Sequence, residues 1–143
     1  METSNEGFIY VLSNPTFPQL LKIGKTQRSP AERAAELSGV TGIPAPFHVA
    51  YEAWISDCDI AEKAIHAKLS SARHNTDREF FQVSFDVARL TVDKVLAEIL
   101  EKEVTALDAN FESRVQEFRS SLQQEIAEKR KRLAARPPKK FLR

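Results

Sequence analysis

The chain has 143 residues, of which 29% are charged and 42% hydrophobic, the balance of a soluble protein with one compact domain and an appendage. Its one cysteine, Cys58, excludes an internal disulfide and a cysteine-based zinc site. The start is acidic and polar, unlike a signal peptide, and no apolar run approaches the ~18 residues of a membrane span. We therefore expect a cytoplasmic or nucleoid-associated protein without a membrane partner.

The net charge of +1 hides an uneven distribution along the chain. Residues 128–143 hold eight Lys and Arg side chains and one acid, so this segment carries +7 and residues 1–127 carry −6. A basic end on an acidic body is typical of a protein with an anionic partner, most commonly nucleic acid. The alternative is a solvated end that keeps the protein soluble.

Two short runs near the start predict a β-hairpin. Residues 7–12 form a β-rich run that Ser13-Asn14-Pro15 ends, and residues 20–24 form a second run. The two runs are close enough to pair as antiparallel strands joined by an irregular loop. We expect a turn at residues 24–26 to lead from the second strand into the next element.

Helix signals follow the hairpin. Ser29 is a candidate cap, Pro30 suits the first helical position, and Glu32 stands three residues after Ser29 as in a capping box. Gly39 is the expected stop. Asp57 is a candidate cap for a second helix over residues 58–70, whose apolar stripe would contain Ile60, Ala61, Ala64, Ile65 and Leu69.

A third strand lies between these helices, and a short extended segment follows them. Residues 47–55 alternate, and the face in the core would hold Phe47, Val49, Tyr51, Ala53 and Ile55. Residues 79–83 are expected to be extended, with Phe80 or Phe81 in the core. The predicted fold class is α+β, a small and mostly antiparallel sheet flanked by helices and followed by a long C-terminal helix.

The C-terminal part predicts one or two long helices, because no glycine or proline occurs between Asp86 and Arg136. Residues 87–100 are expected to pack on the core. Beyond them an 11-residue apolar repeat predicts a nearly straight or slightly right-handed seam. Self-association through residues 104–126 is one interpretation, and a helix folded back on its own domain is the other. The repeat consists of Val104, Leu107, Phe111, Val115, Phe118, Leu122 and Ile126.

Four polar residues stand where a phosphate site could form. Tyr10 lies on the first strand, Lys22 on the second, Lys25 just after it and Arg33 on the first helix. Cations beside a phosphodiester offset the charge of the transition state, and a phenol or a desolvated amine can position or deprotonate a water. By spacing alone, an ordinary hairpin with surface lysines and a core tyrosine is the commoner explanation of the pattern.

Glu62 and His66 share one face of the second predicted helix because they are four residues apart. One carboxylate with waters suffices for Mg²⁺, whereas zinc would need a third ligand that the helix lacks. The alternatives are a surface charge for Glu62 and a half-buried, satisfied imidazole for His66. Arg78 and Glu79 could form a loop ion pair of little energetic value.

Several motifs in the right order resemble one nuclease superfamily. Phe8-Ile9-Tyr10 and Lys22-Ile23-Gly24-Lys25-Thr26 resemble the paired motifs of the GIY-YIG nucleases. The segments Ser29-Pro30-Ala31-Glu32-Arg33 and Arg78-Glu79-Phe80-Phe81 resemble its phage- and fungal-type branch, which has a KIG second motif and a closing REFF motif. Glu62 stands at the position of the family's metal-binding glutamate.

The resemblance implies metal-dependent hydrolysis of phosphodiester bonds in DNA, with RNA as a second substrate class. Tyr10 would orient or activate the water, Arg33 would hold the phosphate, and Glu62 would carry one Mg²⁺ or Mn²⁺. Lys22 would be a fourth catalytic residue, in place of the tyrosine of the second motif. Nucleic-acid contacts would come from Lys25, Arg28, Arg78, Lys129, Arg130, Lys131 and Arg132.

The resemblance covers about residues 7–85, and the change of composition after them predicts the division of the rest of the chain. Residues 1–85 would form the nuclease-like domain, 86–136 the helical segment and 137–143 a basic tail. The family often has a late asparagine near its metal, for which Asn75 is the nearest candidate. Two alternatives to an endonuclease are a non-catalytic nucleic-acid-binding module with an oligomerising helix, and a structural coiled-coil protein capped by the N-terminal domain.

Overall fold

The computed structural model describes residues 4–74 and 79–137, so the predictions for Asn75 and Arg78 lie outside the described residues. The chain divides into two compact units, Met1–Leu100 and Glu101–Arg143. The elements are, in chain order, β1 (Gly7–Ser13), β2 (Leu21–Thr26), α1 (Pro30–Ser38), β3 (His48–Ile55), α2 (Cys58–Lys68), a 3₁₀ turn (Ser70–Ala72), β4 (Phe80–Phe81) and α3 (Phe85–Ala135).

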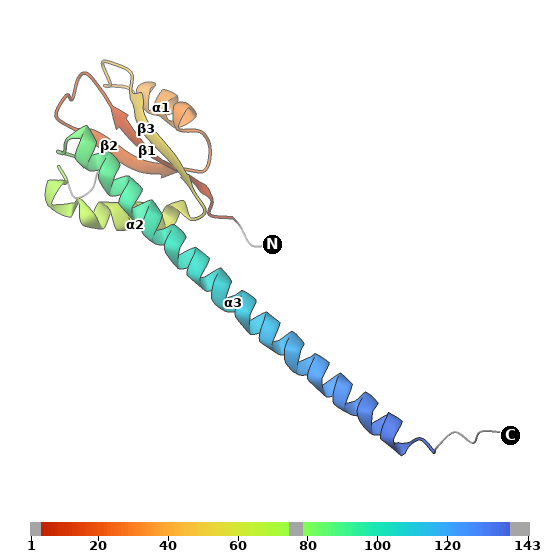
Figure 1. Cartoon of the computed structure of the whole chain (residues 1–143). Helices are drawn as coiled ribbons and strands as arrows, with labels where there is room; N and C mark the ends of the chain where they lie inside the picture. Colours follow the sequence, from red (N-terminus) through yellow and green to blue (C-terminus); the bar gives the residue numbers. More distant parts are fainter. Residues whose placement is uncertain (1–3, 75–78, 138–143) are drawn as a thin grey trace. The chain divides into compact units, whose positions relative to one another are not determined.

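The first unit is an antiparallel four-stranded sheet in the order β3-β1-β2-β4 with helices on both faces, which confirms the predicted α+β class. Helix α1 covers one face, and α2 with the start of α3 covers the other (Figure 1). Alternation along β1 fills both interfaces, since Ile9 and Val11 face α2 and α3 while Tyr10 and Leu12 face α1.

The second strand is longer than predicted. The turn predicted at Gly24, Lys25 and Thr26 is absent, because these residues belong to β2 and pair with Tyr10, Ile9 and Phe8 of β1. The β1–β2 ladder therefore runs without interruption from Phe8–Thr26 to Ser13–Leu21. Thr26 ends the strand, and its side-chain oxygen accepts a hydrogen bond from the backbone N–H of Arg28 at 3.1 Å.

The prediction that Phe47, Val49, Tyr51, Ala53 and Ile55 lie in the interior is confirmed, but these residues divide between two cores. The pairing with β1 shifts between Val11–Tyr51 and Leu12–Val49, so the register has an irregularity at Ala50. An extra residue reverses which side the following residues face. Tyr51 and Ile55 consequently join the α2–α3 core, whereas Val49 joins the core beneath α1. The two-residue strand β4 divides in the same way, with Phe81 in one core and Phe80 against the other.

The two short helices begin as predicted. The Ser29 hydroxyl accepts from the Glu32 backbone N–H at 3.1 Å, and Gly39 is the C-terminal cap of α1. The Asp57 carboxylate accepts from two backbone N–H groups of α2. Helix α2 ends at Lys68, two residues earlier than expected, and Ile60 of its predicted apolar stripe is 57% exposed.

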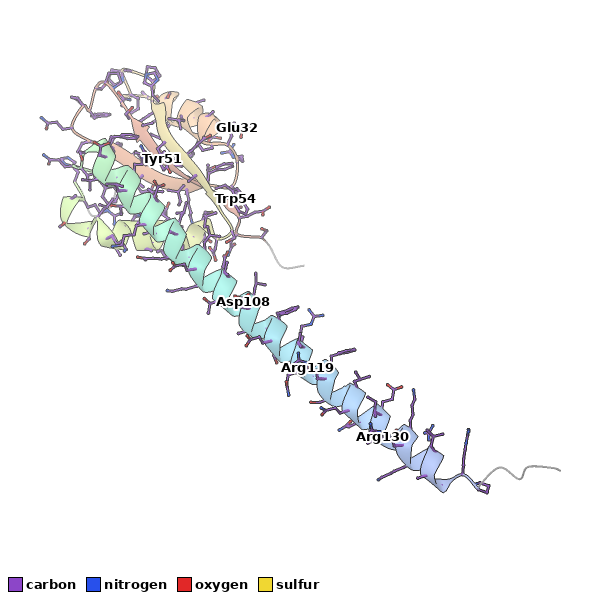
Figure 2. All side chains as sticks on the ribbon, in the orientation of Figure 1. Glu32, Tyr51, Trp54, Asp108, Arg119 and Arg130 are labelled. Atoms are coloured by element: carbon purple, nitrogen blue, oxygen red, sulfur yellow. The ribbon has the colours of Figure 1, made fainter. Side chains whose placement is uncertain are left out.

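A single helix, α3, follows β4, and it belongs to both units. Within the first unit its buried residues are Ala88, Val92, Val95 and Leu96, which confirms that the segment up to residue 100 packs on the core. Within the second unit its large apolar side chains are exposed, and Figure 2 shows side chains all around this part of the helix.

None of the helices in the described part of the chain combines the length and the hydropathy that a membrane-spanning helix requires.

Candidate functional site

The pairing of Tyr10 with Gly24 creates the centre of the candidate site. Both residues face α1, and Tyr10 is 1% exposed. A Cβ added to Gly24 would lie 2.6 Å from the Tyr10 phenol oxygen and 2.8 Å from its ring. Since glycine has no side chain, the ring can cross the neighbouring strand at this point. The glycine of the Lys-Ile-Gly motif is therefore required by close approach of the tyrosine.

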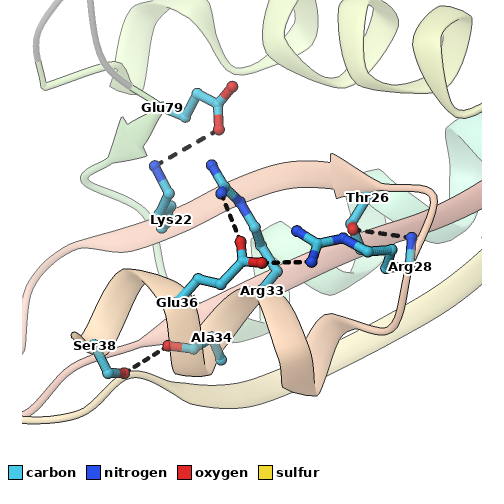
Figure 3. Close-up of polar contacts among 8 residues, drawn as sticks. All are labelled: Lys22, Thr26, Arg28, Arg33, Ala34, Glu36, Ser38 and Glu79. Carbon is cyan, nitrogen blue, oxygen red and sulfur yellow. Dashed lines mark hydrogen bonds and ion pairs between the residues drawn. The ribbon is translucent and has the colours of Figure 1, made fainter. Parts of the chain in front are cut away.

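Arg33 reaches the phenol from α1. Its guanidinium donates a hydrogen bond to the Tyr10 hydroxyl, because a guanidinium has donors only. It also bonds Glu36 at 3.1 Å, and the same carboxylate binds Arg28 at 2.5 Å. Figure 3 shows the guanidinium of Arg33 directed toward Lys22 and Glu79, with Glu36 beside it. Helix α1 thus delivers a cation to the tyrosine and holds it with one carboxylate.

Lys22 and Glu79 complete the α1 side of the cluster. The Lys22 ammonium lies 3.6 Å from the Glu79 carboxylate and 5.0 Å from the centre of the Phe80 ring. The Ile23 backbone N–H donates to the Glu79 carbonyl oxygen at 3.1 Å, which fixes Glu79 beside β2 just before β4 begins. A Cβ on Gly24 would lie 2.7 Å from this carboxylate. The Glu79 carboxylate and the Tyr10 phenol therefore both occupy the space that a side chain at position 24 would fill.

Glu62 and His66 approach the same strand from α2. Strand β4 pairs only with Leu21 and Lys22, and the Glu79 carbonyl accepts the Ile23 N–H, so no strand covers the edge of β2 from the Ile23 carbonyl onward. The Glu62 carboxylate accepts the Lys25 backbone N–H, and the His66 Nε2 lies 2.8 Å from the Ile23 carbonyl oxygen. Side chains one helical turn apart thus replace the missing strand. The interpretation of His66 as a half-buried, satisfied imidazole is confirmed.

Tyr10 and Glu62 have pKa values that are raised above the ordinary ones. Burial raises the pKa of Tyr10, the Arg33 hydrogen bond lowers it, and the charges of Glu79 and Glu62 raise it further. Burial also raises the pKa of Glu62, as does the Glu79 charge, against the lowering effect of His66 and Lys25. Tyr10 is consequently a neutral phenol near pH 7, and two carboxylates lie within electrostatic range of each other.

The other residues predicted to contact nucleic acid do not form one cluster in the structure. Lys25 belongs to the opposite face of the sheet from Lys22 and is paired with Asp59 of α2. Arg28 is exposed and paired with Glu36. The residues Lys25, Thr26, Gln27, Arg28 and Asp59 line one side of an open hollow at the end of β2. The remaining predicted contacts, Lys129, Arg130, Lys131 and Arg132, are exposed residues of α3 in the second unit.

Sequence reasoning missed the central position of Glu79. It placed this residue in a loop ion pair, whereas its carboxylate lies beside Lys22 and above Gly24. The available signal was its place directly before the aromatic pair of β4, because a strand that continues the sheet must bring its first residue to β2. Glu36, which bonds both Arg28 and Arg33, was also missed, although its i,i+3 spacing from Arg33 predicts the pair.

The donor set suits a hydrated, oxygen-preferring cation better than zinc. Glu62 is a partly desolvated carboxylate, and Glu79 adds a second negative charge nearby. Mg²⁺ needs only one or two carboxylates because it keeps most of its waters. Among the residues that the structure describes, no three His, Cys, Asp or Glu side chains are grouped to hold a metal directly. A cation at this place would have Glu62 as its carboxylate ligand, and most of its other ligands would have to be waters.

Comparison with known proteins identifies the domain. The model of the T5orf172 domain matches residues 7–100, about two thirds of the chain and nearly all of the first unit. Comparisons with curated proteins and with solved structures gave no match. The T5orf172 domain is found in phage and bacterial nuclease-like proteins, which is consistent with a role that involves nucleic acid. The chain belongs to the T5orf172 domain family.

Proposed function

We propose that the chain is a metal-dependent endonuclease that hydrolyses phosphodiester bonds in DNA. The observation that carries the proposal is the cluster around Gly24, where a phenol, two cations and two carboxylates from five different elements or loops meet. Membership of a family found in nuclease-like proteins supports it. The resemblance to the GIY-YIG superfamily supports the same reaction and the same residues.

Arg33 and Lys22 are the proposed phosphate ligands. Both cations lie on the α1 side of β2, and each already binds a carboxylate, Glu36 or Glu79. A carboxylate and a phosphate offer similar acceptor oxygens, so a phosphate can take the place of Glu79 beside Lys22. Lys22 then acts electrostatically and need not be a base. The two cations offset the negative charge that develops on the phosphoryl oxygens in the transition state.

Tyr10 is the proposed group that orients the attacking water. Because its pKa is raised, the phenol keeps its proton near pH 7 and is a poor general base. Its oxygen accepts from Arg33, and its own O–H is a donor that can position a water or a phosphate oxygen. Tyr10 is 1% exposed, so substrate must first displace groups above it. A phosphate that displaces the Glu79 carboxylate would take its place as the partner of the mostly buried Lys22 ammonium, so the cation stays paired.

Glu62 is the proposed metal ligand, with Glu79 as a second acid within range. Ionisation of a carboxylate whose pKa is raised by burial is favoured when a divalent cation binds beside it. When bound, Mg²⁺ or Mn²⁺ would supply Lewis-acid stabilisation of the leaving oxygen. The Lys25 backbone N–H holds the Glu62 carboxylate at the edge of β2, so the ligand is positioned before the cation arrives.

The substitution Glu62→Gln tests this assignment. The amide can still accept the Lys25 N–H, but it loses the charge that binds the cation, so Mg²⁺- and Mn²⁺-dependent DNA cleavage should fall by roughly 100-fold or more. Single-turnover cleavage of a plasmid and of a labelled duplex measures the effect. Glu98→Gln is the matched control, since Glu98 is an exposed acid whose partner is Lys68. Cleavage by Glu62→Gln at the wild-type rate would contradict the role of Glu62.

The same variant has an expected signature in stability. A raised folded-state pKa means that Glu62 contributes stability below the ordinary glutamate pKa and loses it as pH rises through the folded value. The uncharged amide of the variant does not titrate, so the variant does not lose this stability as pH rises. The Tm of the Glu62→Gln variant, relative to the Tm of the wild type, should therefore rise as pH increases from about 4 to neutral. Ordinary glutamates have already ionised in this range. A Tm difference between variant and wild type that stays constant across this range, or that shifts in favour of the wild type as pH rises, would show that the assigned desolvation is wrong.

The substitution Gly24→Ala should distinguish the role of Tyr10 in cleavage from the role of Glu62 in metal binding. The new Cβ would lie 2.6 Å from the phenol oxygen and 2.7 Å from the Glu79 carboxylate, so both must move. We expect a folded protein destabilised by about 1–3 kcal/mol, with cleavage lost and Mn²⁺ binding retained. Gly39→Ala is the control, because the nearest atoms to its Cβ would be 3.6 Å away. Full activity in Gly24→Ala would show that Tyr10 need not cross the strand for function.

A non-catalytic nucleic-acid-binding module is the second candidate. The observation that favours it is the low exposure of Tyr10, because a covered phenol can organise a binding surface without touching a water. Pure protein that binds duplex DNA but leaves it intact with Mg²⁺ and with Mn²⁺ would decide for this candidate. Loss of binding in Lys22→Gln together with intact DNA would locate the binding face at the same cluster.

The basic run of α3 is proposed to add sequence-independent phosphate contacts. Lys131 and Arg132 are exposed and carry two of its charges. Replacing both by glutamine should weaken DNA binding and reduce the slope of log K against log salt by about two contacts, or roughly 1.8 units. Fluorescence anisotropy between about 50 and 200 mM salt measures the slope. The control is Lys102→Gln with Lys94→Gln, and an unchanged slope in the Lys131 and Arg132 double variant would exclude these contacts.

A further inference from the structure

We propose that the helix of the second unit pairs with the same helix of a second copy of this chain, in antiparallel orientation and with the two-fold axis near Arg119. The proposal concerns the α3 surface alone and does not depend on the nuclease assignment. Two features support it. The exposed apolar stripe must be buried against another surface, and the charges that flank the stripe favour a second copy of the same helix in antiparallel orientation.

The apolar stripe is exposed along the second unit from Val104 to Leu133, and Lys129 interrupts it once, between Ile126 and Leu133. Its central members are Phe111 and Phe118, each 68% exposed, and Leu107 at 67%. A stripe of large apolar side chains on a helix is stable in water only when another surface covers it. Among the described residues of the second unit there is only the helix itself, so the cover must come from elsewhere. The other exposed members are Val104, Leu122, Ile126 and Leu133.

The stripe matches itself when the second copy runs in the opposite direction. With the axis near Arg119, Val104 lies opposite Leu133 of the second copy, and Phe111 lies opposite Ile126. Val115 similarly lies opposite Leu122, next to the axis. The seam then covers about 30 residues, or roughly 45 Å of helix, and is apolar except at Lys129. Because the repeat is 11 residues long, the two helices can stay in contact over this length with little supercoiling.

Charged residues follow both sides of the stripe at steps of 11 residues. One side carries Asp108, Arg119 and Arg130. The other side carries Glu103, Arg114, Glu125 and Arg136. In two-stranded helical pairs, residues at such flanking positions face each other across the seam and determine orientation. The order of signs along the two flanks therefore distinguishes antiparallel from parallel pairing.

Antiparallel pairing places opposite charges together. Each flank then faces its own counterpart on the second copy. Opposite pairs are Glu103 with Arg136, Arg114 with Glu125 and Asp108 with Arg130, and the single like-charged contact is Arg119 with itself at the axis. Glu125 also bonds Lys129 within the helix at 3.0 Å, but both side chains are exposed and the carboxylate can accept from two donors.

Parallel pairing in register places like charges together. The two flanks would then face one another with an offset of five residues, as in parallel coiled coils. Glu103 would face Asp108 and Arg114 would face Arg119, and only Glu125 with Arg130 would be opposite. The basic residues near the end of α3 would also lie beside their own copies. Like charges across a seam select against that arrangement, so the sign pattern favours the antiparallel one.

The pairing leaves part of the basic run available to another partner. Lys131 lies on the side of the helix away from the seam, and Arg132 lies outside the flanking positions. These are the two residues to which phosphate contacts are assigned above. Self-association and an anionic partner therefore use different sides of the same helix.

Sedimentation equilibrium of the full chain tests the seam. Wild type should be a dimer, and Leu122→Glu should weaken dimerisation by roughly 100-fold or more, because the carboxylate would be buried without a partner. Gln124→Glu adds the same charge on the opposite side of the helix and should remain dimeric. Leu122 is 45% exposed in the single chain, so the first unit should keep its Tm in both variants. A monomeric wild type, or an assembly of three or more copies, would overturn the proposal.

Arg114→Glu tests the direction. In the antiparallel pair it places two acids together and should weaken the dimer several-fold, whereas in a parallel pair it would face Arg119 and tighten the dimer. Adding Glu125→Arg to Arg114→Glu exchanges both charges and should restore wild-type dimerisation. Tightening by Arg114→Glu alone, or no recovery in the double variant, would contradict antiparallel pairing.

Discussion

The close approach of Tyr10 to Gly24 is the constraint on which the candidate site depends. A β-ladder places these two residues opposite each other, and the absence of a side chain on Gly24 lets the phenol cross β2. Arg33 can bond the phenol because the ring brings the hydroxyl toward α1, and Glu79 can lie above the same glycine. One missing Cβ thus determines where a guanidinium, a carboxylate and a phenol meet.

The uncovered edge of β2 explains why α2 contributes to the same cluster. Strand β4 is two residues long, and it leaves the backbone groups from the Ile23 carbonyl onward without a neighbouring strand. An unpaired buried N–H or C=O is costly, so Glu62 and His66 satisfy them. In doing so, α2 places a partly desolvated carboxylate beside Tyr10 and Glu79. The same contact closes the sheet and creates an acid suited to a divalent cation, at a cost to stability near neutral pH.

Local signals in the sequence predicted most of the fold. The caps at Ser29 and Asp57 and the alternation along residues 47–55 act within a few residues, and the structure contains all of them. The irregularity in β3 was not predictable, because Ala50 has no special residue type and the shift follows from pairing with β1. The convergence of Tyr10 with Arg33 was expected from motif order. The place of Glu79 required the register of β4 on β2, which no local pattern specifies.

The most direct test of the account is single-turnover cleavage of DNA by the Tyr10→Phe variant in saturating Mg²⁺. Phenylalanine keeps the ring across Gly24 and removes only the hydroxyl that Arg33 bonds. The account predicts that DNA affinity is retained while the rate of cleavage falls by about 100-fold or more. Cleavage at the wild-type rate would contradict it, because the group at the centre of the cluster would then have no part in the reaction.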